Sequence, residues 1–110
     1  QGKTAEAMKK LEALNSGGGA ERLGSTLQTL MAAGYENLNK PAEAAKSYLA
    51  AAATSIGDAK VQRQADAARS YMAAGNTTEA LKLWTELAKD ERGALAAEAH
   101  VRIGELAVKQ

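Results

Sequence analysis

Apolar positions recur along most of the chain with the spacing of an amphipathic α-helix. From Thr78 onward the apolar residues follow the i, i+3, i+4, i+7 pattern, and they are Ala80, Leu81, Leu83, Trp84, Leu87 and Ala88. A second segment shows the same spacing, with Leu23, Leu27, Leu30, Met31 and Leu38. Valine and isoleucine are scarce, which does not favour strands. The pattern therefore predicts an all-α chain.

Helix-breaking residues divide the chain into separate helical segments. Clusters of Gly, Asn, Ser, Asp and Pro mark the breaks, and the predicted helices cover about 4–14, 21–38, 42–54, 59–74, 78–89 and 94–108. Pro41 stands near a helix start, where its missing N–H costs little. Thr77 or Thr78 is expected to cap the next helix, with Glu79 in its first turn.

The predicted helices repeat along the chain. Glu-Ala pairs occur at 6–7, 43–44 and 79–80, at spacings of 37 and 36 residues. Four residues after each alanine stands a large side chain, and these are Leu11, Tyr48 and Trp84. Tyr35 and Tyr71 are also 36 residues apart. Such a period predicts stacked helix pairs with the three large side chains packed between helices.

These positions resemble the tetratricopeptide (TPR) repeat. The Leu-Gly-x2-Tyr part resembles Met31-Ala32-x2-Tyr35, Ala67-Ala68-x2-Tyr71 and Ile103-Gly104-x2-Ala107. The Ala-x3-Phe part resembles Ala7-x3-Leu11, Ala44-x3-Tyr48 and Ala80-x3-Trp84. The chain departs from the motif at the leading Trp, where Gln28, Gln64 and His100 stand, and it lacks the closing Pro.

The resemblance implies an all-α, TPR-like α-solenoid of about six antiparallel helices in a right-handed superhelical stack. One domain would contain a half-repeat at 1–19, repeats at 20–56 and 57–92, and a half-repeat or capping helix at 93–110. We favour a piece excised from a longer array, and natural terminal caps are the alternative.

In TPR-like arrays the first helices of successive pairs line a concave groove that holds an extended peptide or a helix. The resemblance places in this groove Thr26, Thr29, Glu36, Asn37, Gln62, Arg69, Met72, Glu98 and Glu105, with Ala33, Ala65, Ala73, Val101 and Val108 between them. TPR domains that grip a C-terminal carboxylate use Lys, Asn and Arg at such places, and here only Arg69 is suitable. A carboxylate clamp is therefore not expected.

The resemblance implies a protein–protein interaction scaffold that binds a protein or peptide partner. Self-association is the alternative, with Val101, Val108 and the open repeat ends docking on another copy. The alanine-rich repeats look similar to periplasmic TPR proteins that assist envelope assembly or secretion. This likeness favours the bacterial periplasm or cell envelope, with the cytoplasm as the alternative.

Composition and charge narrow the set of functions. The formal charge is +1, from 14 basic and 13 acidic side chains, so a nucleic-acid partner is not expected. No apolar run approaches the roughly 18 residues of a membrane span, so membrane insertion by this segment is not expected. Cysteine is absent, which excludes disulfides and thiolate metal sites.

Catalytic and ligand-binding motifs are weak. Gly2-Lys3-Thr4 resembles the end of a phosphate-binding loop but lacks the earlier glycine, so a turn between helices is expected there. Gly17–Gly19 is expected to be a flexible connector. His100, the only histidine, is expected to be packed or half-buried. The carboxylates are scattered, and the chain is not expected to be an enzyme or to bind a cofactor or metal.

Overall fold

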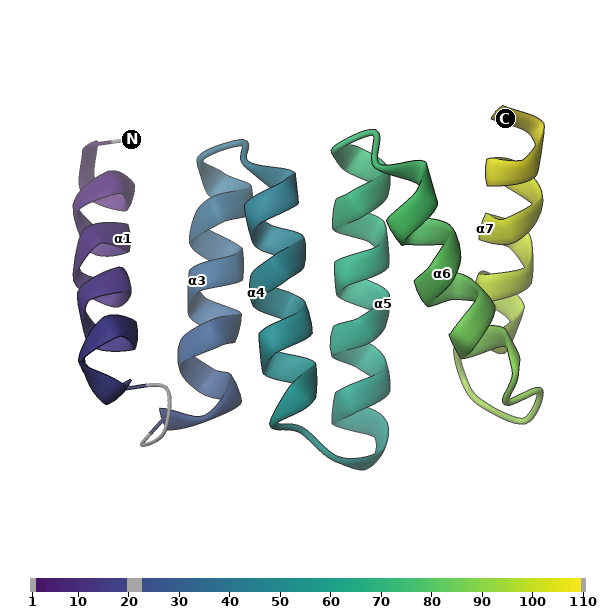
Figure 1. Cartoon of the computed structure of the whole chain (residues 1–110), viewed down its shortest axis with the longest axis horizontal. Helices are drawn as coiled ribbons and strands as arrows, with labels where there is room; N and C mark the ends of the chain where they lie inside the picture. The colour runs from purple at the N-terminus through teal and green to yellow at the C-terminus, as the bar shows by residue number, and fades with distance from the viewer. Residues whose placement is uncertain (1, 20–22, 110) are drawn as a thin grey trace.

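The computed structural model describes residues 2–19 and 23–109, and over them it shows six α-helices joined by short connections (Figure 1). The helices are α1 (Gly2–Leu14), α3 (Ser25–Asn37), α4 (Pro41–Ala53), α5 (Gly57–Ala73), α6 (Thr77–Ala88) and α7 (Ala96–Lys109), and a π-helical turn, η1 (Asn15–Gly19), follows α1. No strand occurs in these ranges. The all-α prediction is confirmed, and its helix bounds lie within a few residues of those observed.

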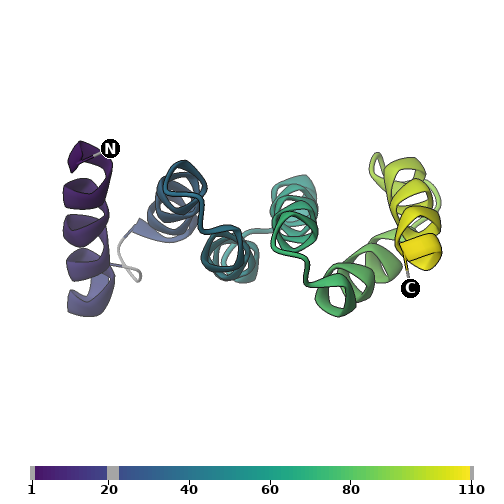
Figure 2. The same cartoon turned by 90° about the horizontal axis from the view of Figure 1, so that it is seen from above.

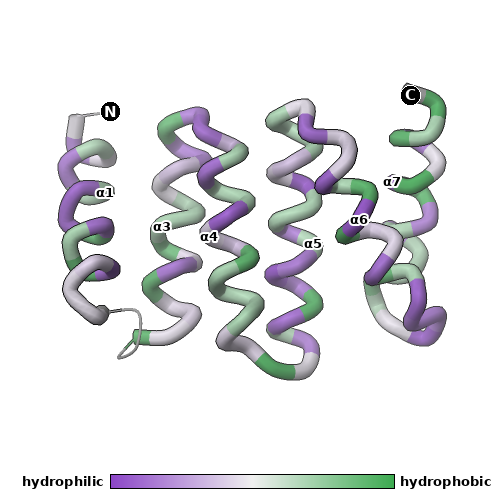
Figure 3. Tube along the Cα trace, in the orientation of Figure 1, coloured by the Kyte–Doolittle hydropathy of each residue, from purple (hydrophilic) through white to green (hydrophobic). Residues whose placement is uncertain are grey.

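The helices stand side by side in the order of the sequence, and each packs mainly on its neighbours along the chain (Figure 1). The Cα body measures 39 × 28 × 17 Å. Seen from above, α3, α5 and α7 lie on one side of the row and α4 and α6 on the other (Figure 2). Hydrophobic and hydrophilic positions alternate along the helices, as expected of amphipathic helices between neighbours and solvent (Figure 3). None of the described helices is long and apolar enough to cross a bilayer.

The α3–α4 and α5–α6 turns are the same backbone structure, 36 residues apart. In the first, the N–H groups of Leu38, Asn39 and Lys40 donate to the carbonyls of Gly34, Glu36 and Tyr35; in the second, those of Ala74, Gly75 and Asn76 donate to Ser70, Met72 and Tyr71. Asn39 and Gly75 both have left-handed backbone, with φ of 59° and 79°. Asn and Gly are the residues that adopt this conformation most readily. The 36-residue period in the sequence is therefore also a period in the turns.

Buried alanines lie at the contacts between successive helices. Ala32, Ala44, Ala68 and Ala80 are fully buried, and they belong to four successive helices. Trp84 is fully buried as well, in the largest apolar cluster, with α5 and α7 residues around it. Tyr48 is buried and Leu11 is partly buried against Met8, Leu27 and Met31. The predicted packing of these three large side chains is confirmed.

The polar ends of the two large aromatic side chains find equivalent partners. The Tyr48 hydroxyl donates to Glu36 Oε1 at 2.6 Å, and Trp84 Nε1 donates to Met72 Sδ at 3.3 Å. Each partner stands 12 residues before its aromatic residue, on the preceding helix. The two pairs are thus related by the 36-residue period. Burial and the hydrogen bond to Glu36 raise the pKa of Tyr48.

Helix α1 packs on α3 at Gly34. A Cβ on Gly34 would lie 2.1 Å from Sδ of Met8, so the missing side chain makes room for the buried methionine. Beside this contact, the Tyr35 hydroxyl donates to Glu12 Oε2 at 2.5 Å, and this hydrogen bond raises the pKa of Tyr35 to about 12.

Two local predictions at helix ends are wrong. Gly2-Lys3-Thr4 was expected to be a turn, but these residues form the first turn of α1. Asn76, rather than Thr77 or Thr78, caps α6: its Oδ1 accepts the N–H of Glu79 at 3.5 Å. Gly17–Gly19, the expected connector, does lie at a kink after α1, where Gly18 has a left-handed φ of 91°.

Helix α3 differs from its prediction at its start and on one face. The expected start at residues 21–22 lies outside the described residues, and the helix begins after Gly24, whose φ is 57°. Leu30, which fits the apolar spacing of this segment, is 53% exposed, and Leu23 is exposed as well. Helices α1 and α4 cover the Leu27, Met31 and Ala32 sides of α3 but leave the Leu30 side open.

The central packing residue can be tested by truncation. Trp84→Ala should lower the free energy of unfolding by about 3–5 kcal/mol, because it removes a fully buried ring from between α5, α6 and α7. Urea denaturation followed by circular dichroism measures the change. Leu30→Ala is the control and should have a much smaller effect. A Trp84→Ala chain as stable as its parent would contradict this core.

Candidate functional site

The predicted groove residues lie on α3, α5 and α7 but differ in how open they are. Thr26, Glu36, Asn37, Gln62 and Glu105 are exposed, whereas Thr29, Arg69, Met72 and Glu98 are partly buried. Ala65 was expected to line the groove and does not, because it is fully buried in the cluster around Trp84. The structure therefore removes Ala65 from the candidate binding surface and keeps the exposed and partly buried residues.

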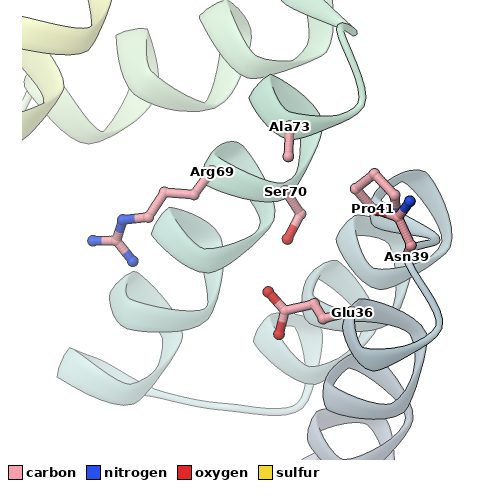
Figure 4. A pocket seen from close by; sticks show the side chains of 6 residues that line it. All are labelled: Glu36, Asn39, Pro41, Arg69, Ser70 and Ala73. Carbon is pink, nitrogen blue, oxygen red and sulfur yellow. The ribbon is translucent and has the colours of Figure 1, made fainter. Parts of the chain in front are cut away.

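A first pocket, of about 250 Å³, lies between the α3–α4 turn and α5 (Figure 4). Its lining is Glu36, Asn39, Pro41, Arg69, Ser70 and Ala73. The Glu36 carboxylate points toward Ser70, whereas the Arg69 guanidinium points away from Glu36 (Figure 4). The inner part of this pocket is thus acidic, and it suits a group that donates hydrogen bonds.

A second pocket, of about 440 Å³, lies between α5 and α7 and is lined by Met72, Arg102, Glu105 and Val108. Two of its residues are the 36-residue equivalents of residues in the first pocket: Met72 corresponds to Glu36, and Glu105 corresponds to Arg69. The two pockets therefore share two lining positions one 36-residue period apart. Met72 and Val108 make the second pocket more apolar than the first.

The Arg69 guanidinium joins α5 to α7 through a two-pronged ion pair. Its Nε and Nη2 donate to the two carboxylate oxygens of Glu98 at 2.9 and 2.6 Å. Its Nη1 donates to Asp66 at 2.9 Å, and its Cζ lies 5.9 Å from the centroid of the Trp84 ring. Planar bidentate pairs of this kind are among the stronger ionic contacts. Arg69 thus holds two helices in position.

This ion pair belongs to a chain of six alternating charges. Arg63 Nη2 pairs with Asp66 Oδ2 at 3.3 Å, and Arg102 pairs with Glu98 at 3.3 Å and with Glu105 at 3.0 Å. The hydrogen bond from Arg69 lowers the pKa of Glu98, and the same bond raises the pKa of Arg69. The hydrogen bond to Glu105 raises the pKa of Arg102. These six charged side chains are thus engaged with one another.

Because Arg69 pairs with Glu98 and Asp66, substituting it would affect the fold as well as any partner binding. An Arg69→Glu substitution would place a carboxylate against both Glu98 and Asp66, and it would disturb the packing of α7 together with the pocket. It would not isolate partner binding. Sequence reasoning missed the pairing across helices, although the i, i+3 and i, i+4 spacings within each helix were visible in the sequence.

Other predicted residues make contacts within the chain. Thr29 Oγ1 donates to the Ser25 carbonyl at 2.8 Å, and Asn37 Oδ1 accepts from Thr4 Oγ1 of α1 at 3.0 Å. Thr26 and Gln62 line neither of the two pockets. The structure brings together Glu36 and Arg69 in one pocket, and Met72 and Glu105 in the other.

His100 is exposed on α7, so the prediction of a packed or half-buried ring is wrong. No described helix covers that side of α7. Within residues 2–19 and 23–109, no group of three or more His, Cys, Asp or Glu side chains could hold a metal ion.

The α5–α7 ion pair predicts an acid-sensitive contribution to stability. Glu98→Gln should lower the free energy of unfolding at pH 7 by about 1 kcal/mol, the upper end of the range for partly exposed pairs. Because the folded state lowers the Glu98 pKa, the contribution is present above the ordinary value of 4.5 and is lost as the pH falls through the folded-state pKa. The two chains should therefore converge in stability in strong acid.

Urea denaturation at several pH values measures this difference. Glu86→Gln is the matched control, because in the described part of the chain Glu86 pairs with Lys89 alone and both side chains are well exposed. It should change stability little at any pH. A Glu98→Gln difference that did not depend on pH would contradict the role assigned to this carboxylate.

Comparison with known proteins gives no relative for this chain: no protein-family model matches it, and neither does any curated protein or solved structure. The resemblance to TPR repeats consequently rests on the residues of the chain alone.

Proposed function

We propose that this chain is a TPR-like interaction scaffold, in which α3, α5 and α7 hold an extended segment of a partner protein. The observation that carries the proposal is the pair of pockets between α3 and α5 and between α5 and α7, which share two lining positions 36 residues apart. The repeated turns and the repeated aromatic contacts support a solenoid of helix pairs. A binding face that repeats with the fold suits a ligand that is itself extended.

The chemistry of the two pockets suggests the ligand. In the first, the Glu36 carboxylate, the Asn39 amide and the Ser70 hydroxyl provide acceptors for a basic side chain or for backbone N–H groups. In the second, Met72 and Val108 offer apolar contact, and the flexible thioether of methionine adapts to different shapes. The proposed ligand segment therefore places a basic or donor group before or after an aliphatic side chain.

Binding, rather than catalysis, is the activity we propose. The ionic groups between α5 and α7 pair with one another and support the fold. They are therefore poorly suited to act as general acids or bases on a substrate. The nearly balanced charge favours a protein partner over nucleic acid. The alanine-rich repeats favour the bacterial periplasm or envelope over the cytoplasm, on resemblance.

An alanine-to-lysine substitution tests the first pocket. Ala73 is an exposed residue at the end of α5 and lines this pocket, so Ala73→Lys should fill it and place an ammonium group near Glu36. The wild-type chain should capture a partner from extracts of its source cells. Ala73→Lys should bind that partner at least tenfold more weakly, which corresponds to about 1.4 kcal/mol.

Ala53→Lys is the matched control. Ala53 is likewise an exposed alanine at the end of a helix, α4, and it does not line the pocket. Lysine is favourable in the last turn of either helix, so both variants should fold. Affinity measured by calorimetry should be normal for Ala53→Lys. Equal affinity of both variants for the partner, or no specific capture by the wild type, would contradict the proposal.

A further inference from the structure

One side of α7 is not covered by any described residue. Val101, Gly104, Glu105 and Val108 lie on it at helical spacing, and Val101 and Val108 are 60% and 87% exposed. We call these four residues the α7 end face. The two valines thus expose apolar side chains on one side of α7, and the equivalent side of α5 shows what such a side contacts when it is covered.

The equivalent side of α5 is a buried helix contact. The residues 36 positions earlier are Ala65, Ala68, Arg69 and Met72. Ala65 and Ala68 are fully buried, Arg69 lies over the Trp84 ring, and Met72 accepts the Trp84 N–H. On α5 this side therefore receives the next helix, α6. The α7 end face is therefore equivalent to a surface that packs on a helix. At the positions of the buried Ala65 and Ala68, it carries Val101 and Gly104, which are also apolar or small.

Gly104 gives an independent indication that a helix docks closely here. Its equivalents, Ala32 and Ala68, are fully buried where a neighbouring helix approaches. A Cβ on Gly104 would meet nothing within 4 Å, so packing inside the chain does not require a glycine. Glycine in the middle of a helix is less favourable than alanine. A helix that approaches from outside the described chain would account for it.

Helix α1 exposes the complementary kind of face. Lys3, Ala7, Lys10 and Leu14 are exposed and lie along one side of α1, which we call the α1 end face. Ala7 and Leu14 correspond to Ala80 and Leu87 of α6, 73 residues later, and both of these are buried against α5. The α1 end face is therefore built like the side of α6 that docks on α5.

The two end faces also carry opposite charges. Lys3 and Lys10 flank Ala7 on α1, whereas Glu105, which also pairs with Arg102 at 3.0 Å, lies between the valines of the α7 end face. Opposite charges around an apolar contact favour association and fix its orientation. We propose that the α7 end face of one copy packs on the α1 end face of a second copy, as α5 packs on α6.

The proposed contact is head to tail, since it joins two different surfaces. Such an interface does not close on itself, so a dimer still has one free face of each kind and can bind further copies. The contact shares Glu105 and Val108 with the second pocket, and it includes Val101, which the sequence also placed in the groove. It does not depend on the partner-binding function proposed above.

Two lysine substitutions block the two faces separately. Val101→Lys blocks the α7 end face, and Leu14→Lys blocks the α1 end face at the C-terminus of the helix, where lysine is favourable. In sedimentation velocity from micromolar to millimolar concentration, the wild-type chain should form dimers and longer chains. Each variant alone should associate at least about tenfold more weakly.

The decisive measurement is a mixture of the two variants. The α7 end face of the Leu14→Lys chain and the α1 end face of the Val101→Lys chain are both intact. An equimolar mixture should therefore form a one-to-one dimer and stop there, because the two remaining faces are both blocked. Ile56→Lys is the control: Ile56 is 88% exposed at the α4–α5 turn, outside both faces, and its substitution should leave association unchanged.

Gly104→Leu provides a second test by size rather than by charge. The new side chain has free space within the chain, so the helical circular dichroism should be unchanged while association is lost. A wild-type chain that stays monomeric to millimolar concentration would overturn the proposal. So would association that survives Val101→Lys or Gly104→Leu, or a mixture of the two lysine variants that stays monomeric.

Discussion

Close approach through alanine is the constraint on which the rest of this structure depends. At Ala32, Ala44, Ala68 and Ala80 the helices meet with no exposed surface, and a larger side chain at any of these places would push the backbones apart. The ring of Trp84 fixes α6 between α5 and α7, and the ring of Tyr48 lies in a cluster with Ala32 and Ala44.

The same constraint determines what the candidate binding face presents. The rings reach across from α4 and α6, and their polar ends are satisfied by Glu36 on α3 and by Met72 on α5. These two residues also line the two pockets. Core packing and the chemistry of the face are thus linked through single side chains, one carboxylate and one thioether. Arg69 also lines the first pocket, but its guanidinium lies near the Trp84 ring and pairs with Glu98 of α7. The Glu36 carboxylate is therefore the charged group that the first pocket offers to a ligand.

The helices and the period could be predicted from the sequence because both follow from local patterns. Apolar spacing and breakers locate six helices, and the Glu-Ala pairs give the 36-residue register that the turns of the structure share. Features that depend on which helix packs against which side of another helix could not be predicted. Leu30 fits the apolar pattern of α3 but is left open, and the Arg69–Glu98 pair requires the approach of two helices that are separate in sequence. His100 was expected to be covered, and no described helix lies over it.

The contacts between consecutive helices have a consequence for how the molecule opens. Each helix is stabilised mainly by its neighbours along the chain, so contact order is low and an end helix can detach while the middle stays folded. At one end, α7 is held by its apolar contacts with α6 and by ionic bonds to α5. Salt screens those bonds but leaves the apolar contacts intact. Raising the ionic strength should therefore make α7 detach from α5 and α6 more often. The amide hydrogens of α7 should then exchange with solvent faster than those of α4 and α5.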